Sequence, residues 1–196
     1  MSQLTPVTEQ DIRAFCESCS WTFQAWSIHR VFQDSLPPGD SRLARKHGYF
    51  LNRLGIISQE YTLLQIAKLD DPAIQSGKLN LTVDRIVEHG NWDRATRAQL
   101  EELRVELRIL PSHLSVLRNK ILAHHDRDVA LAGTAVGGFP AGMDESYFEA
   151  LHAFASLAHK ATFGFIYAFD DFARRDTELF VADLVAMSSD GQVGNA

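Results

Sequence analysis

The chain has 196 residues, of which 45% are hydrophobic and 22% are charged, and its formal net charge is −6 at pH 7. This length suits one domain with a hydrophobic core of its own. The negative charge excludes a protein that coats nucleic acid through bulk positive charge. Binding of nucleic acid would therefore require a local basic site, or a second subunit that completes one.

The sequence also argues against a membrane or secreted protein. No uncharged run approaches the roughly 18–20 residues that a membrane-spanning helix needs. The start, MSQLTPVTEQDIR, lacks the basic-then-apolar order of a secretion signal. We therefore expect a cytoplasmic protein. Cys16 and Cys19 lie one turn apart on a predicted helix, and a single CxxC without a second pair of ligands favours two small residues of a reduced protein over a zinc site.

The first half of the chain predicts two long helices. Thr8 is suited to cap the first, whose apolar residues recur at helical steps until the PPG sequence of residues 37–39 ends it. Ser41 is suited to cap the second, which runs to about Leu69 and stops at the DDP sequence of residues 70–72. Residues 73–80 are expected to form a loop.

Shorter helices are expected in the middle of the chain. Thr82 caps one that ends near His89, and a charged helix follows over residues 93–110. Pro111 interrupts this helix, and Ser112 caps a continuation that reaches His124 or His125. The interruption is either a new helix start or a kink.

The last third of the chain is aromatic. A glycine-rich loop at residues 133–142 precedes Asp144, which is suited to cap a single long helix extending to Arg175. Phenylalanines lie on more than one face of this helix. It is therefore expected to be buried on two sides, as in a bundle centre or a dimer interface. A small-molecule pocket lined by these rings is an alternative.

The predicted fold class is all-α, an up-and-down bundle of five to six helices. One domain spans residues 1–175, and a partly disordered tail spans residues 176–196. His152 and His159 are seven residues apart on one helix face. No carboxylate pair accompanies them, so we interpret them as surface or interface residues and expect neither a metal nor another cofactor.

The stretch LRNKILAHHDRD, residues 117–128, concentrates polar chemistry at the end of an apolar stripe formed by Leu110, Leu114, Leu117 and Ile121. On a helix, Arg118 and His125 fall on nearly the same face, about 10 Å apart along the axis. His124 falls on the opposite edge of the stripe. An ordinary helix end is the alternative interpretation, because cations near a helix C-terminus offset the macrodipole.

This stretch resembles the signature of the HEPN superfamily, an arginine, often followed by a polar residue, and then a histidine after a short spacer. Arg118-Asn119 with His124 fits, and so does Arg118 with His125. The string is most similar to the abortive-infection, AbiU-type branch, whose motif looks like RNKxxAHxD. The segment FLNRLGIISQEYTLLQIAKLDDPAIQSGKLNLTVDRIV, residues 50–87, also resembles that branch. The resemblance covers roughly residues 8–172 and implies a HEPN-like helical fold.

The resemblance implies a metal-independent endoribonuclease, acting in phage defence or as the toxin of a toxin–antitoxin pair. Attack of a ribose 2′-OH on the adjacent phosphate needs a base of near-neutral pKa and a fixed cation. The family pattern assigns the base to His124 and the cation to Arg118, with Asn119 orienting the arginine or bonding the phosphate. Helix geometry keeps His125 as the alternative base. Asp126 would cap the helix end or hold the tautomer of His124.

HEPN-type enzymes typically place two motifs across one cleft, so the resemblance also implies a homodimer. Two copies of Arg118, Lys120 and Arg127 would then gather positive charge in an otherwise acidic particle. The implied partners are RNA and an antitoxin or nucleotidyltransferase-like protein. A non-catalytic HEPN interaction module, which binds such a partner and cleaves nothing, is the alternative.

Overall fold

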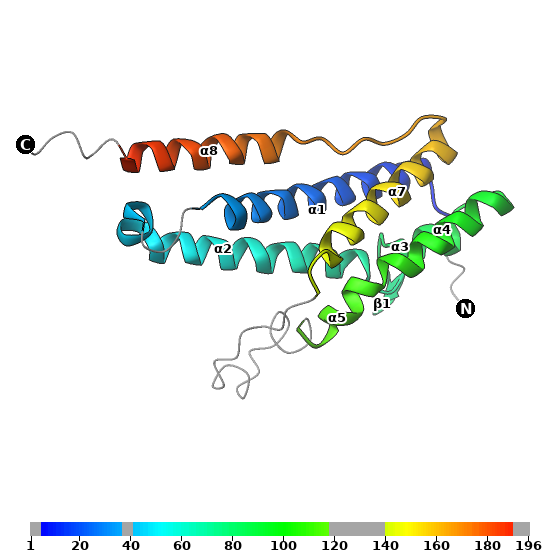
Figure 1. Cartoon of the computed structure of the whole chain (residues 1–196). Helices are drawn as coiled ribbons and strands as arrows, with labels where there is room; N and C mark the ends of the chain where they lie inside the picture. Colours follow the sequence, from blue (N-terminus) through cyan, green and yellow to red (C-terminus); the bar gives the residue numbers. More distant parts are fainter. Residues whose placement is uncertain (1–4, 37–40, 118–139, 190–196) are drawn as a thin grey trace, which may run out of the picture. The chain divides into compact units, whose positions relative to one another are not determined.

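The computed structural model describes residues 5–36, 41–117 and 140–189 (Figure 1). These residues are almost entirely helical, which confirms the all-α class. The helices are α1 (Glu9–Ser35), α2 (Arg42–Leu69), α3 (Val83–His89), α4 (Arg94–Leu107), α5 (Ile109–Leu117), α7 (Met143–Phe163) and α8 (Phe172–Ser189). A hairpin of two short antiparallel strands, β1 (Ile74–Gln75) and β2 (Lys78–Leu79), follows α2.

The chain divides into two compact units, and each is described by itself. The first unit comprises Met1–Trp21 and Leu63–Phe169, and the second comprises Thr22–Thr62 and Asp170–Ala196. Both α1 and α2 therefore contribute residues to each unit. No helix in the described part of the chain is long and apolar enough to cross a membrane.

The first unit has an aromatic core built around α7. The rings of Phe15 and Phe154 are completely buried and meet edge to face, with their centroids 5.7 Å apart. Helix α4 packs on α7, α3 packs on α4, and α5 contacts both α4 and α7. Fully burying an apolar side chain contributes roughly 1.5–3 kcal/mol. Rings such as these therefore provide much of the stability of this unit.

The second unit has a smaller core, formed by α1, α2 and α8. Val31, Phe32 and Val181 are buried, and the partly buried residues packed on them are Ile28, Leu36, Leu54 and Val185. The rings of Phe32 and Phe180 meet at 6.4 Å. The side-chain amide of Gln24 also donates to the carboxylate of Asp170 at 3.1 Å. These contacts hold the start of the C-terminal segment to α1.

The predicted helix caps at Thr8, Ser41 and Thr82 are confirmed, and Asp93 caps α4 in the same way. The hydroxyl of Thr8 accepts from the Asp11 N–H at 3.2 Å, and the Asp11 carboxylate accepts from the Thr8 N–H at 2.8 Å. The side chains of Ser41, Thr82 and Asp93 likewise each accept from the backbone N–H three residues further along. Each bond satisfies a donor that has no partner within its helix.

The segment expected as a loop at residues 73–80 contains the hairpin. Ser76 and Gly77, at its centre, have φ angles of 51° and 77°. Two successive residues with positive φ form the type of turn whose twist matches an antiparallel hairpin. The single glycine was a turn signal, but strands of only two residues leave no alternation to detect in the sequence.

The break before α5 lies at Arg108, and the expected interruption at Pro111 is wrong. Pro111 is the third residue of α5. A proline fits in the first turn of a helix, because the N–H it lacks would have no partner there. The N–H of Ser112 donates to the carbonyl of Arg108 at 3.1 Å, so Ser112 lies within the helix and is not its N-cap.

The long aromatic helix expected from Glu145 to Arg175 is also wrong. Helix α7 ends at Phe163, because Gly164 adopts a φ of 85° and its N–H donates to the Lys160 carbonyl, a common helix C-cap. The N-cap of α7 is Gly142 and not Asp144. The tail expected from residue 176 onward is helical as far as Ser189, as part of α8.

Candidate functional site

The predicted site residues follow α5 directly but lie outside the described residues. These are Arg118, Asn119, Lys120, His124, His125 and Asp126. Leu110 and Leu114 of α5 are buried, which confirms the predicted apolar stripe at those two positions. Because α5 contacts α4 and α7, the helix that leads into the motif is fixed in the core of the first unit.

Arg104 of α4 and Arg108, the C-cap of this helix, form an ionic cluster with α3. The guanidinium of Arg104 bonds Asp84 at 3.4 Å and Glu88 at 3.1 Å, and it also contacts Glu101. Arg108 donates to both oxygens of Asp84, at 2.7 and 2.9 Å. These two cations are neutralised by neighbouring carboxylates. They fix α3 against α4 and are poorly placed to attract a further anion.

The histidines of α7 are structural. His159 is buried, and its Nδ1 lies 2.8 Å from the carbonyl oxygen of Phe165. Its ring contacts those of Phe163, Phe165 and Tyr167. The ring of His152 lies against Phe169. Within residues 5–36, 41–117 and 140–189, no cluster of three or more potential metal ligands occurs.

The two cysteines are buried thiols of the first unit. Burial, with a smaller contribution from Glu17, raises the pKa of Cys16 to about 12. Burial also raises the pKa of Cys19 well above its usual value. The Cys16 thiol donates to the carbonyl of Ala155 at 3.6 Å. Only a thiolate is a good nucleophile or metal ligand, so both side chains act as small core residues, as the sequence favours.

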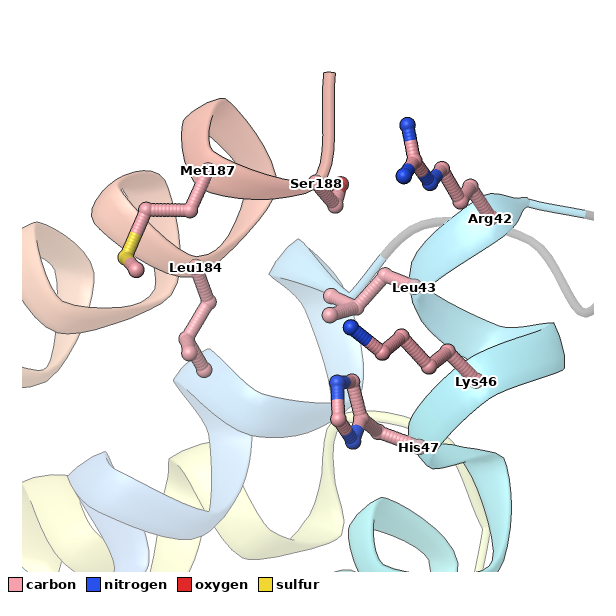
Figure 2. A pocket seen from close by; sticks show the side chains of 7 residues that line it. All are labelled: Arg42, Leu43, Lys46, His47, Leu184, Met187 and Ser188. Atoms are coloured by element: carbon pink, nitrogen blue, oxygen red, sulfur yellow. The ribbon is translucent and has the colours of Figure 1, made fainter. Parts of the chain in front are cut away.

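A basic pocket lies in the second unit, between the N-terminal end of α2 and the C-terminal end of α8 (Figure 2). Its volume is about 160 Å³. The residues that line it are Arg42, Leu43, Lys46, His47, Leu184, Met187 and Ser188. Figure 2 shows Leu43, Lys46 and His47 extending from α2 toward α8. The pocket thus combines cationic side chains with an apolar lining.

The charges at this pocket suit an anion. No acidic residue occupies the first turn of α2, so the partial positive charge of the helix start reinforces Arg42 and Lys46. Neither side chain forms an ion pair with a described residue. An anionic group attached to an apolar or aromatic body, such as a nucleotide, would match this combination of charge and lining.

Sequence reasoning missed the pocket. The basic sequence RLARKH at residues 42–47 was a local signal of positive charge. The apolar lining comes from residues 184–188, however, which are about 140 positions away in the chain. Those residues fell in the segment expected to be a tail. Without the helix α8, the basic residues appear as one exposed helix turn.

The comparisons with known proteins place the motif in a family context. A family model described as AbiU2, of the HEPN superfamily, matches residues 13–180. This range covers most of the chain and includes the motif at residues 117–128. The predicted resemblance is thereby confirmed. Neither a curated protein nor a solved structure matches the chain.

Proposed function

The chain belongs to the AbiU2 family of the HEPN superfamily, and from this premise we propose that it is a metal-independent endoribonuclease of abortive infection or of a toxin–antitoxin pair. The observation that carries the proposal is the sequence Arg118-Asn119-Lys120, followed by His124, within the matched range. Helix α5 supports it, because the burial of Leu110 and Leu114 anchors the chain immediately before the motif in the core of the first unit.

The proposed reaction is an internal transesterification of RNA. His124 removes the proton from a ribose 2′-OH, and that oxygen attacks the adjacent phosphorus as the bond to the 5′-oxygen breaks. The products are a 2′,3′-cyclic phosphate and a 5′-hydroxyl, whose proton comes from a second imidazole or from solvent. Arg118 stabilises the charge that develops on the phosphate oxygens. Asn119 orients the guanidinium or bonds the phosphate.

The active assembly in this proposal is a homodimer. A single Arg118–His124 pair supplies one base and one cation, whereas two copies facing one cleft supply a base, an acid and two cations. A dimer also concentrates positive charge, including Lys120, in a chain whose net charge is −6. RNA is the substrate, and an antitoxin or nucleotidyltransferase-like partner is the restraint.

The basic pocket of the second unit is proposed as an additional contact for RNA. Arg42 and Lys46 would bind a phosphate, and the apolar lining from Leu184 and Met187 would accept part of a base or ribose. In this assignment the motif carries the chemistry, whereas the pocket contributes affinity alone.

The test is cleavage of a labelled RNA by the full-length chain in excess EDTA. We expect products with 2′,3′-cyclic phosphate ends. The Arg118→Ala and His124→Ala variants should each lose about 10²–10³-fold in rate, the loss typical of a removed general base or electrostatic group. His125→Ala should retain most of the activity if His124 is the base. An inactive His125→Ala variant beside an active His124→Ala variant would assign the base to His125.

His113→Ala is the matched control for the histidine variants. His113 lies on α5, is exposed, and has its Nδ1 2.9 Å from the carbonyl oxygen of Ile109 in the preceding turn. The His113→Ala variant removes an imidazole close to the motif in the sequence but leaves the motif itself intact. Its rate of RNA cleavage should therefore equal that of the wild type. Absence of cleavage by the wild type at every salt and metal concentration, with tight binding of a protein partner, would instead favour the non-catalytic module.

A further inference from the structure

The outward side of α2 in the second unit carries large apolar side chains. Tyr49 is 78% exposed and Ile57 is 60% exposed, and Ile56 is also exposed. Arg53 and Glu60 are the charged residues among them. We refer to Tyr49, Arg53, Ile56, Ile57 and Glu60 as the α2 outer face. An apolar patch of this kind on a helix surface commonly marks a contact with another molecule.

Helix geometry places these five residues together. They follow one another at steps of four, three, one and three residues. At roughly 100° per residue, their positions fall within an arc of about 100° on the helix. The exposed ring of Phe50 borders this arc. The face is therefore a continuous strip along α2 that a second helix can cover.

Four of the five residues of the strip are arranged symmetrically about a point between Ile56 and Ile57. Arg53 stands three residues before Ile56, and Glu60 stands three residues after Ile57. If a second α2 lies antiparallel across it, with a two-fold axis between Ile56 and Ile57, each Ile56 meets the Ile57 of the other copy. Each Arg53 then meets a Glu60. This is the condition for an isologous interface, in which one surface is complementary to itself.

The charges of the strip are available for such a contact. The guanidinium of Arg53 lies over the ring of Tyr49, 5.6 Å from its centroid. Neither Arg53 nor Glu60 forms an ion pair with a residue that the structure describes. Two intermolecular Arg53–Glu60 pairs would therefore flank an apolar centre, which is the usual arrangement of a polar rim around a hydrophobic core.

We propose that the α2 outer face binds the same face of a second copy of this chain, in antiparallel orientation. The self-complementary order of charges favours a second copy, because a two-fold axis brings each Arg53 opposite a Glu60 without any further sequence requirement. Aromatic side chains bury on the order of 150–250 Å² each. Tyr49 and Phe50 with the two isoleucines thus supply much of the roughly 800 Å² per partner found in stable interfaces.

This inference deepens the proposed function, on which it rests for the need of a dimer, by naming a surface of the second unit that contributes to self-association. It is decided by self-association alone, without RNA. A wild-type chain that forms the dimer but does not cleave RNA would contradict the nuclease proposal. A wild-type chain that cleaves RNA, and whose dimer is unaffected by substitutions in the α2 outer face, would contradict the interface. The two failures are therefore distinguishable.

The test is a charge exchange on the full-length chain, measured by sedimentation velocity at micromolar concentration. The wild type should be a dimer. In the Arg53→Glu variant, both contacts between positions 53 and 60 bring two carboxylates together. In the Glu60→Arg variant, both contacts bring two guanidinium groups together. Each single variant should raise the dimer Kd by at least about tenfold, because like charges across an interface repel.

The decisive arm mixes the two single variants. One copy then carries only carboxylates at positions 53 and 60 and the other only guanidinium groups, so an equimolar mixture should form a heterodimer. The double variant R53E/E60R should likewise recover the homodimer. A structural defect in either variant would not be repaired by mixing. Circular dichroism of each variant alone would confirm that the helices are retained.

Two further variants complete the design. Ile57→Asp should abolish the dimer, because it places carboxylates beside the two-fold axis. Gln59→Glu adds the same charge on a different, exposed face of α2 and should leave the Kd within about twofold of the wild type. A monomeric wild type, single variants that remain dimeric, or a mixture that stays monomeric would each overturn the proposal.

Discussion

The two units differ in where their aromatic residues and their cations lie. In the first, Phe15 and Phe154 meet in a completely buried core, and Arg104 and Arg108 are bonded to carboxylates of their own unit. In the second, Tyr49 and Ile57 face outward, and Arg42 lines a pocket without an ion pair to a described residue.

The difference indicates that the two units have different roles. Buried rings and an ionic cluster fixed by Asp84 make the first unit a stable scaffold, and this unit carries the helix that leads into the Arg118 motif. A unit with unsatisfied charges and exposed apolar side chains offers surfaces for other molecules. Substitutions in the first unit should therefore affect the free energy of unfolding, and substitutions in the second should affect association and RNA binding.

Removal of a core ring should have the largest effect on stability. Phe154→Ala leaves a cavity in the first unit and should lower the free energy of unfolding by about 3–5 kcal/mol. Phe172→Ala removes a ring that is 72% exposed in the second unit, so its effect should stay within about 0.5 kcal/mol. Urea denaturation followed by circular dichroism measures both. Equal losses would remove the contrast between buried and exposed aromatic residues.

The ionic cluster should give the next largest effect. Asp84→Ala removes the carboxylate that Arg104 and Arg108 share, and the partly buried guanidinium of Arg104 loses a partner. We expect a loss of about 1–3 kcal/mol. Glu178→Ala breaks the exposed pair with Arg174 on α8 and should cost about 0–0.5 kcal/mol. The same denaturation series compares the two, and a larger cost for Glu178→Ala would contradict the account.

Charge reversal in the basic pocket should weaken RNA binding without loss of stability. Arg42→Glu combined with Lys46→Glu should raise the Kd for RNA by about tenfold and reduce the salt dependence of binding by about two phosphate contacts. The control reverses Arg94 and Lys78, exposed cations of the first unit. Fluorescence anisotropy over a salt series measures both pairs. If the control pair weakened binding as much, the pocket would have no particular role.

The smallest expected effect concerns the cap of α4. Hydrogen bonds from the Thr96 backbone and hydroxyl lower the pKa of Asp93 in the folded state. A lowered folded pKa stabilises the fold above the unfolded pKa, and this contribution is lost as the pH falls through the folded pKa. Asp93→Ala should therefore be less stable than the wild type at neutral pH, and the difference should shrink in acid. A difference that grows as the pH falls would contradict this sign.

The sequence predicted best those features that depend on residues close together in the chain. The caps at Thr8, Ser41 and Thr82 depend on residues within one helical turn, so the pattern alone locates them. The end of α7 at Gly164 was missed because aromatic residues at near-helical steps continue beyond it. The first turn of α5 tolerates Pro111, which an expectation based on proline as a helix breaker could not anticipate.

Features that join distant residues required the structure. The pocket combines Lys46 with Leu184, and neither position signals the other in the sequence. The site motif was recognised neither from a local pattern nor from the structure. Arg118 and His124 stand out only through resemblance to a family, because their spacing alone also suits an ordinary helix end. The family match over residues 13–180 confirms the resemblance, whereas the choice of Arg118 and His124 and their chemical roles stay predictions.

The most direct test of the central claim is the chemical nature of the RNA ends produced by the full-length chain with all divalent metal chelated. The account predicts 2′,3′-cyclic phosphate and 5′-hydroxyl ends, formed by the wild type and nearly absent with His124→Ala and Arg118→Ala. Ends of the opposite polarity, strict dependence on added metal, or undiminished cleavage by both variants would contradict it.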